Sequence, residues 1–249
     1  MCGTCGCADD GPGVRLTEIG GAGGGNGQGH GHGHRVDLEV DLLAGNDALA
    51  ARNRARFDAA GILAVNLMSS PGAGKTTLLE RTVRAWEGPC AVLEGDQETT
   101  ADADRIAAAG ARAVQINTGA GCHLDAAMVA RGVDALDPGP GAVLFVENVG
   151  NLVCPALFAL GEHVRVVIMS VTEGADKPLK YPHMFRTADL VLLNKIDLLP
   201  YVDFVVAEWE AAVRRARPEA EILRVSATTG AGLEAWLGLL RTLRAPVPS

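Results

Sequence analysis

The sequence predicts a doubly wound α/β fold with a mostly parallel sheet, preceded by a flexible N-terminal tail. Unbroken apolar runs such as Val164–Ser170 alternate along the chain with helical segments, as expected of parallel strands that are buried on both faces. One of these runs leads into a Gly-rich loop that ends in Lys75-Thr76, which is the arrangement of a P-loop. Together these observations favour a P-loop domain over residues 36–249.

The composition is that of a globular chain with an acidic balance. The chain has 249 residues, of which 48% are hydrophobic, and a formal net charge of -8 at pH 7. A nucleic-acid partner would require a basic face, so none is expected. No apolar run is long enough to span a bilayer and no secretory signal is visible, which predicts a cytoplasmic protein without a membrane partner. In that compartment the six cysteines are better explained as metal ligands or core residues than as disulfides.

Residues 1–35 are expected to form a flexible tail. Glycine dominates from Gly20 to Gly33 and large apolar residues are nearly absent. Such a segment cannot bury enough surface to offset the entropy lost on ordering. A helix rich in Ala and Arg is expected next, over Asn46–Ala60, and Gly61 closes it.

Strands and helices then alternate to the end of the chain, with no internal repeat. The strands are predicted from apolar runs at Ile62–Met68, Cys90–Glu94, Ala113–Ile116, Ala142–Glu147, Val164–Ser170, Leu190–Leu193 and Glu221–Val225. The intervening helices are predicted at Thr76–Trp86, Thr100–Ala109, Cys122–Arg131, Val202–Arg215 and Leu233–Leu240.

The Gly-rich loop after the first strand predicts a phosphate site. Its glycines allow backbone N–H groups to surround phosphate oxygens, and the following helix contributes the positive end of its dipole. Lys75 is expected to reach the β- and γ-phosphates and Thr76 to hold Mg²⁺. Ser69 stands where the usual pattern has Gly, and a Gly-rich turn without a ligand is the structural alternative. The candidate nucleotide-binding residues here are Gly72, Ala73, Gly74, Lys75, Thr76 and Thr77.

Asn194-Lys195-Ile196-Asp197 follows a later strand and predicts that the base is guanine. The Asp197 carboxylate can accept hydrogen bonds from the ring N–H and the exocyclic amino group of guanine, a pair that adenine does not offer. Asn194 can bind the other side of the base, and the stem of Lys195 can cover the ring. After the next strand, Ser226-Ala227 presents a backbone N–H that could meet the guanine oxygen.

Glu147-Asn148-Val149-Gly150 ends another strand and is expected to face the γ-phosphate. A backbone N–H at Gly150 could sense this phosphate, while Glu147, directly or through water, could touch Mg²⁺. Hydrolysis is therefore assigned to Lys75, Thr76, Glu147 and Gly150. Asp96 is a second Mg²⁺ candidate, although it could equally be an ordinary loop carboxylate or a helix cap.

The tail carries a candidate nickel site. Cys2, Cys5 and Cys7 are close enough in sequence to wrap one ion, and removal of Met1 would free the Cys2 amine as a fourth ligand. Three sulfurs and one nitrogen suit a square-planar Ni(II) or Cu(II) site, and an inert tail is the alternative. The alternating His30, His32 and His34 can bind Ni²⁺ or Zn²⁺ weakly, or are low-complexity sequence without a ligand.

A second metal site is proposed within the P-loop domain. Cys122-His123 is expected to open a helix, and Cys154 lies four residues after Gly150. Both segments flank Gly-rich or Pro turns and do not resemble core, so Cys122, His123 and Cys154 are candidates for one shared site. Cys90 is interpreted as a core residue, and the lone histidines His163 and His183 as structural.

These motifs together resemble the HypB-type hydrogenase nickel-incorporation GTPases. The resemblance rests on the Cys2–Cys7 tail, the Ser69–Thr77 loop, Cys-His-Leu-Asp, Glu-Asn-Val-Gly-Asn-Leu-Val-Cys-Pro and Asn-Lys-Ile-Asp, in this order. It implies a GTPase that binds GTP or GDP and helps to insert Ni²⁺ into the [NiFe]-hydrogenase large subunit, together with other maturation proteins. It also implies a GTP-dependent homodimer whose interface holds Zn²⁺ or Ni²⁺ at Cys122, His123 and Cys154, and it makes Ser69 the expected residue.

Two other readings compete with this one. The chain could be a metal store whose nucleotide site is secondary, but its His tract is short. It could also be a GTPase chaperone for another nickel or cobalamin enzyme, which the Cys tail disfavours. Some members carry a further His where Ala127 stands, which argues against a two-metal version of the second site without deciding the matter.

Overall fold

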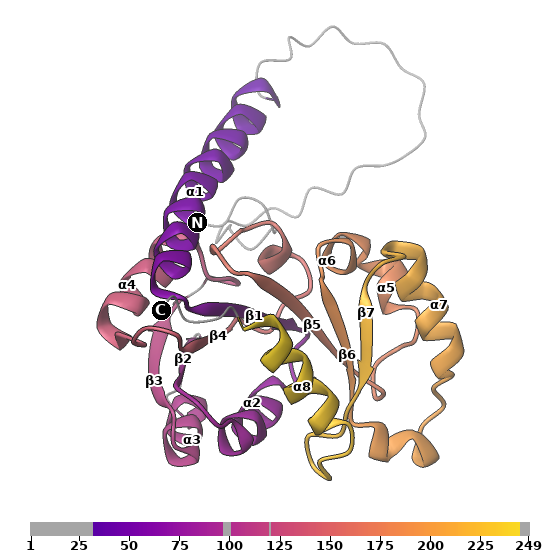
Figure 1. The fold of residues 1–249 in the computed structure, drawn as a ribbon. Coiled ribbons are helices and arrows are strands. Elements are labelled where there is room, and N and C mark those ends of the chain that lie inside the picture. Colours follow the sequence, from indigo (N-terminus) through magenta and orange to yellow (C-terminus); the bar gives the residue numbers. More distant parts are fainter. Residues whose placement is uncertain (1–31, 97–100, 120, 245–249) are drawn as a thin grey trace, which may run out of the picture.

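The computed structural model of the chain describes residues 32–96, 101–119 and 121–244 (Figure 1). These residues form one seven-stranded sheet of order β3-β2-β4-β1-β5-β6-β7, in which every neighbouring pair is parallel. The predicted doubly wound α/β fold is confirmed. The strands are β1 (Leu63–Ser69), β2 (Cys90–Asp96), β3 (Arg112–Asn117), β4 (Val143–Glu147), β5 (Val164–Ser170), β6 (Leu190–Asn194) and β7 (Glu221–Arg224).

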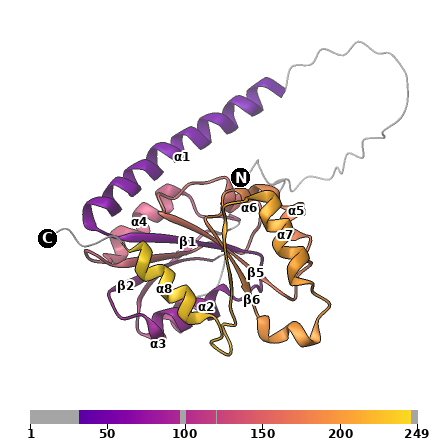
Figure 2. The ribbon, with the colours of Figure 1, turned by 45° about the vertical axis from the view of Figure 1, so that its right-hand side comes forward.

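Helices cover both faces of the sheet. One face packs against α2 (Lys75–Ala85), α3 (Ala101–Ala109) and α8 (Leu233–Leu243), which lie together in Figure 2. The other face packs against α1 (His32–Ala60), α4 (Ala126–Leu136), α6 (Pro182–Arg186) and α7 (Val206–Ala216). Side chains alternate along a strand between the two faces of the sheet. In β1, Val65 and Leu67 therefore pack on the first face, and Ala64 and Met68 pack on the second.

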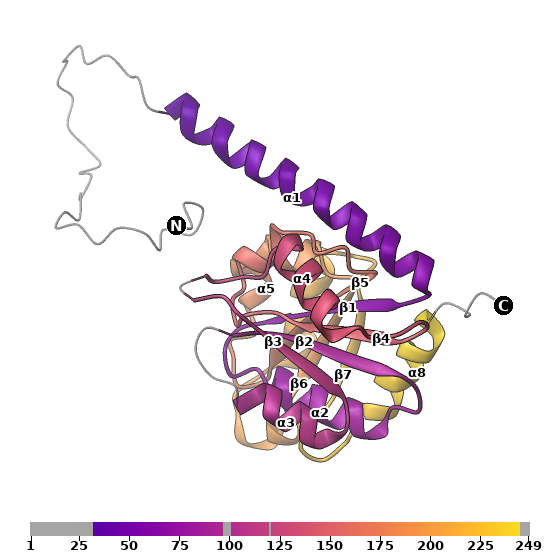
Figure 3. The same cartoon turned by 90° about the vertical axis from the view of Figure 1, so that its left-hand side faces the viewer.

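Helix α1 is longer than the sequence predicts. It begins at His32 rather than Asn46, so His32 and His34 belong to its first turn and residue 35 lies inside it. Its C-terminal part packs on the domain through Phe57, and its N-terminal part projects away from the domain (Figure 3). Gly61 ends the helix as expected: at a φ of 62° its N–H donates to Asp58 O, and Ile62 N–H donates to Phe57 O.

The helix predicted at Cys122–Arg131 is displaced toward the C-terminus. Helix α4 begins at Ala126 because Asp125 caps it, with Asp125 Oδ1 accepting the Met128 N–H at 2.7 Å. Cys122 and His123 therefore lie in the preceding loop, and the prediction that they open the helix was wrong.

The segments after β4, β5 and β6 also differ from the prediction. Short helices η1 (Cys154–Ala156) and α5 (Lys177–Lys180) were not predicted, nor was α6. The helix predicted at Val202–Arg215 begins four residues later, as α7, because Val202 is extended. A 3₁₀ segment, η2 (Ile196–Tyr201), precedes it and was not predicted. Within the part of the chain that the structure describes, no helix has the length and apolarity needed to cross a membrane.

Candidate functional site

The P-loop connects β1 to α2 and holds the first candidate site. Gly74, at the N-cap of α2, has a φ of 94°, and a Cβ there would lie 2.6 Å from Asn194 Nδ2, so only glycine fits. Lys75 Nζ donates to Ser69 Oγ at 2.9 Å. Ser69, the departure from the usual pattern, thus holds the ammonium group in place. Burial lowers the pKa of Lys75, against the opposing effect of Glu147 and Asp102.

A cavity of about 560 Å³ opens above the P-loop, next to the carboxyl ends of β2 and β4. In parallel α/β sheets ligands bind at this edge. The wall contains the predicted Mg²⁺ residues and all the predicted phosphate-loop residues except Ala73. It also contains Glu94, Asp102 and Arg105, which sequence reasoning missed. Its lining residues are Pro71, Gly72, Gly74, Lys75, Thr76, Thr77, Glu94, Gly95, Asp96, Asp102, Arg105, Glu147, Asn148, Val149, Gly150 and Lys195.

Carboxylates surround the Thr76 hydroxyl. Thr76 Oγ1 lies 2.8 Å from Glu147 Oε1 and 3.0 Å from Asp102 Oδ2. Burial raises the pKa of Glu147, while Lys75 opposes the shift. Burial, followed by repulsion from Glu147 and Asp102, raises the pKa of Glu94 to about 8. Carboxylates clustered in this way repel one another when they are ionised, and a bound cation would relieve that repulsion.

The oxygen set fits Mg²⁺. Among the described residues, Oε2 of Glu94 and Oε2 of Glu147 are buried without a hydrogen-bond partner. Unpaired buried carboxylate oxygens are costly unless a cation or another donor binds them. Thr76, Glu147 and Asp102 offer hard oxygen ligands of the kind that Mg²⁺ prefers, and Asp96 lies in the same wall. Asp102 lies in the first turn of α3, and an acidic residue at such a position was the only signal in the sequence that could have pointed to it.

The guanine motif lies against the P-loop. Asn194 Nδ2 donates to Ala73 O at 2.9 Å, and Asn194 Oδ1 accepts the Ala227 N–H at 3.1 Å. Lys195, at a positive φ of 61°, donates to Gly72 O at 2.7 Å. The structure therefore brings the two predicted segments together around the loop.

Asp197 is held by the second base segment. Ser226 Oγ donates to Asp197 Oδ1 at 2.5 Å, and the Ser226 hydroxyl also accepts the Thr229 N–H at 3.1 Å. These bonds fix the carboxylate on which the prediction of guanine binding depends.

Gly150 lies close to the P-loop. A Cβ at Gly150 would be 3.1 Å from Pro71 Cα, and both residues line the cavity. This close approach places the segment after β4 beside the loop that is expected to hold phosphate.

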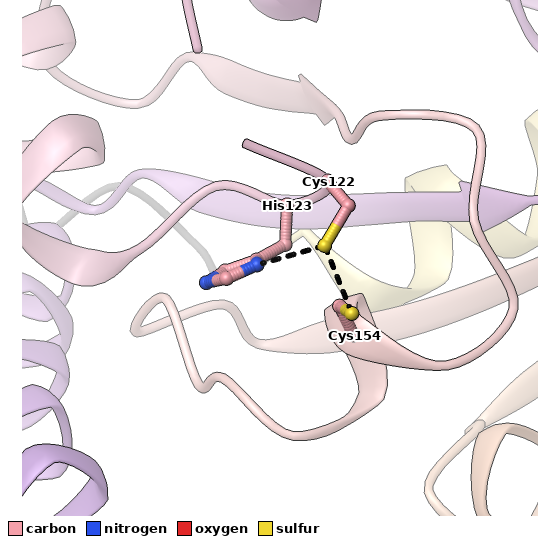
Figure 4. Close-up of side chains that lie close together, drawn as sticks. All are labelled: Cys122, His123 and Cys154. Atoms are coloured by element: carbon pink, nitrogen blue, oxygen red, sulfur yellow. Dashed lines mark hydrogen bonds between the residues drawn. The ribbon is translucent and has the colours of Figure 1, made fainter. Parts of the chain in front are cut away.

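The second candidate site is the cluster of Cys122, His123 and Cys154, whose ligand atoms all lie within 4.8 Å of one another (Figure 4). Cys122 Sγ is 2.9 Å from Cys154 Sγ and 3.7 Å from His123 Nδ1. Neither of these two cysteines forms a disulfide in the structure. With metal–sulfur bonds of about 2.3 Å, two thiolates on one ion lie roughly 3 to 4 Å apart, so a small side-chain rotation would accommodate a metal. The structure brings together the three ligands that the sequence proposed.

The surroundings of the cluster differ from the expectation. Cys122 and Cys154 are both buried, so the view that these segments do not resemble core was wrong. His123 stacks on Phe158 with ring centroids 3.9 Å apart, and burial lowers the pKa of His123 against the opposing effect of Asp125. A neutral imidazole is the form that binds a metal.

The described residues do not test the other metal ligands that the sequence predicts, which lie in the N-terminal part of the chain. Cys2, Cys5, Cys7 and His30 lie outside the described residues. His163 is structural, as expected, since its Nδ1 accepts the Ala64 N–H at 3.0 Å and its Nε2 lies 2.8 Å from Asp58.

Comparison with known proteins shows what the chain resembles. The family profile described as "CobW/HypB/UreG, nucleotide-binding domain" matches residues 63–224. Over 211 residues the chain is 56% identical to the hydrogenase maturation factor HypB of Escherichia coli K12, covering 84% of this chain and 73% of that protein. It is 41% identical over 198 residues to the hydrogenase/urease maturation factor HypB of Helicobacter pylori J99, covering 78% of this chain and 81% of that protein.

Two solved structures share the fold at substantial identity. HypB from Helicobacter pylori in complex with nickel superposes with a TM-score of 0.77 at 39% identity, covering 82% of this chain and 99% of that one. HypB from Archaeoglobus fulgidus gives a TM-score of 0.76 at 40% identity, covering 81% of this chain and all (100%) of that one.

Proposed function

The chain belongs to the HypB family of hydrogenase maturation factors, and on this premise we propose that it hydrolyses GTP to GDP and phosphate while controlling Ni²⁺ delivery to the [NiFe]-hydrogenase large subunit. The observation that carries the proposal is the presence of a nucleotide cavity and a Cys-His-Cys cluster in one domain. The segment from Glu147 to Cys154 contributes to both.

Binding of guanine is supported by the position of Asp197. Its carboxylate is held by Ser226, while Asn194 and Ala227 are bonded to each other beside the P-loop. The two oxygens of a fixed carboxylate select guanine, which offers a ring N–H and an amino group as donors. Adenine offers no such pair of donors, so it would leave the carboxylate unpaired.

Hydrolysis is supported by the charges that converge on the phosphate site. Lys75 and the backbone N–H groups of the P-loop would bind the β- and γ-phosphates, and Gly150 would orient the γ-phosphate from the opposite side. Thr76, Glu147 and Asp102 are the residues that would hold Mg²⁺. When bound, Mg²⁺ neutralises charge on the phosphate oxygens.

The metal cargo would bind at the Cys122–His123–Cys154 cluster, as Ni²⁺ or Zn²⁺. Two thiolates and one imidazole suit either ion and leave at least one coordination position for another ligand. We place this site at a GTP-dependent homodimer interface, where a second copy can complete it. The tail site at Cys2, Cys5 and Cys7 and the weak His30, His32 and His34 site remain predictions. Other maturation proteins and the hydrogenase large subunit are the proposed partners, in the cytoplasm.

A test of the proposal combines nucleotide turnover with metal stoichiometry. The purified full chain should hydrolyse GTP with Mg²⁺ and barely turn over ATP, and it should bind Ni²⁺ at more than one site. Equal turnover of GTP and ATP would contradict the guanine assignment. Metal binding without any GTP hydrolysis would favour the metal-store alternative instead.

A further inference from the structure

The loop that carries Cys122 and His123 is attached to the wall of the nucleotide cavity by one buried side chain, Asn148. Asn148 lines the cavity directly after Glu147 and is only 1% exposed. Its Oδ1 accepts two backbone N–H groups, from Leu124 at 3.1 Å and from Val149 at 3.0 Å. Leu124 immediately follows His123 in the loop between β3 and α4, which we call the metal loop. One amide oxygen therefore joins the metal loop to Val149, the residue before Gly150.

Packing reinforces this attachment. The Leu124 side chain covers Gly95, where a Cβ would lie 2.8 Å from Leu124 Cγ, and Gly95 also lines the nucleotide cavity. At the other end of the same loop, Thr118 N–H donates to Asp96 O at 3.0 Å. The metal loop is therefore held at both ends by residues of the cavity wall.

Asn148 itself is fixed to the strand that leads into the P-loop. Its N–H donates to Leu67 O at 3.0 Å, and its Nδ2 donates to Asn66 Oδ1 at 3.3 Å. If Val149 and Gly150 move toward a γ-phosphate, Asn148 Oδ1 must either follow them, carrying the Leu124 N–H, or lose one of its two bonds. A buried N–H that loses its acceptor pays the full cost of its lost hydration, which is enough to bias a loop between two positions.

We propose that Asn148 is the positioning residue through which the bound nucleotide sets the placement of Cys122 and His123, and hence metal affinity at the Cys122–His123–Cys154 cluster. This inference rests on the proposed function, because it assumes that both nucleotide and metal bind. It places the coupling on the Cys122–His123 side of the cluster as well as on the side of Cys154, which lies four residues after Gly150.

The test compares metal affinity in two nucleotide states. The parent is the full chain with Cys2, Cys5 and Cys7 changed to Ala and with His30, His32 and His34 changed to Ala. Ni²⁺ is titrated with GDP and with a non-hydrolysable GTP analogue, and the two dissociation constants should differ by about 10-fold or more. In Asn148→Ala the ratio should fall to about 2 or less, while Asn148→Asp, which keeps the acceptor oxygen, should retain most of it.

Asn46→Ala is the matched control. Asn46 is also a buried amide that joins separate segments: its Oδ1 accepts the Ala126 N–H at 2.9 Å and its Nδ2 donates to Ala159 O at 2.8 Å. It does not line the nucleotide cavity, so its variant should lose stability but keep the affinity ratio. If Asn148→Ala fails to fold, Asn148→Ser, which is too short to hold both N–H groups, replaces it.

The outcomes separate the two proposals. A parent that binds Ni²⁺ equally in both states, or not at all, overturns the nucleotide control of metal in the proposed function and the role of Asn148 with it. A parent with a large ratio that persists in Asn148→Ala overturns the role of Asn148 alone. If Asn46→Ala also loses the ratio between the two Ni²⁺ dissociation constants, the effect is one of general destabilisation. That outcome would also overturn the role of Asn148.

Discussion

At the scale of single residues, polar side chains that are fixed or buried shape the candidate nucleotide site. Ser69 holds the Lys75 ammonium, and Ser226 holds the Asp197 carboxylate. Glu94 and Glu147 are acids that burial makes reluctant to ionise. Each of these groups is placed before a ligand arrives, which reduces the reorganisation that binding requires.

Asp197→Asn should change the base preference. The amide replaces one acceptor by a donor, which opposes guanine and suits xanthine, whose corresponding edge carries a carbonyl group. We expect GTP affinity to fall by about 10-fold or more and xanthosine triphosphate to become the better substrate. Competition binding measures this change. The exposed Asp203→Asn is the control and should leave the preference for GTP intact; the same result for Asp197→Asn would refute the base assignment.

Glu94 should make the nucleotide-free protein less stable as pH rises. Its pKa is raised from 4.5, the ordinary value that we take for the unfolded chain, to about 8 in the folded chain. Between these two pH values the folded state therefore binds more protons than the unfolded state. Stability from this group is therefore present below pH 4.5 and is lost progressively as pH rises toward 8.

Urea unfolding in buffers without Mg²⁺ tests this. Between pH 5 and pH 8, Glu94→Gln should lose less unfolding free energy than the parent, because the amide cannot ionise. The exposed Glu221→Gln should follow the parent. Parallel pH profiles for the parent and Glu94→Gln would show that Glu94 ionises freely in the folded chain.

At the scale of elements, the strands and the P-loop could be predicted from the sequence, and several loops could not. Strands buried on both faces leave unbroken apolar runs such as Val164–Ser170, and the P-loop motif is local. Cys122, in a loop, and Cys154, at the start of η1, are buried by tertiary packing, which their flanking Gly and Pro residues do not indicate. Asp102 joins Thr76 only through tertiary packing, across a sequence separation of 26 residues.

Helix α1 depends on a glycine in a neighbouring loop. Gly161 has a φ of 95°, and a Cβ there would lie 2.6 Å from Ala50 O and 2.7 Å from Asn53 Cβ. Gly161→Ala should therefore push α1 off the domain and cost roughly 3 kcal/mol of unfolding free energy. Gly139→Ala is the control, since Gly139 has a φ of 78° but no atom within 4 Å.

Gly139→Ala should cost only the backbone strain, about 1 kcal/mol. Chemical denaturation of both variants gives the comparison. Equal losses would mean that the close approach of α1 to Gly161 does not limit its packing.

For the whole molecule, the parallel sheet brings the two sites into one functional unit. The cavity lies at the carboxyl ends of β2 and β4, and the candidate metal ligands come from the segments that follow β3 and β4. The spacing of Cys122, His123 and Cys154 only suggested a shared metal site, and the resemblance of the ordered motifs to one family strengthened that prediction. The contacts that join the sites, Asn148 with Leu124 and Leu124 with Gly95, require the folded structure because they link residues from separate strands and loops.

The most direct test of the nickel-delivery role is hydrogenase activity in cells that lack this chain. We expect [NiFe]-hydrogenase activity to be lost on deletion and to return when excess Ni²⁺ is added to the medium, since a chaperone mainly raises the local supply of the metal. Re-expression of the chain should restore activity at ordinary Ni²⁺ levels. Full hydrogenase activity in the deletion strain without added nickel, or a loss that no amount of Ni²⁺ repairs, would contradict the account.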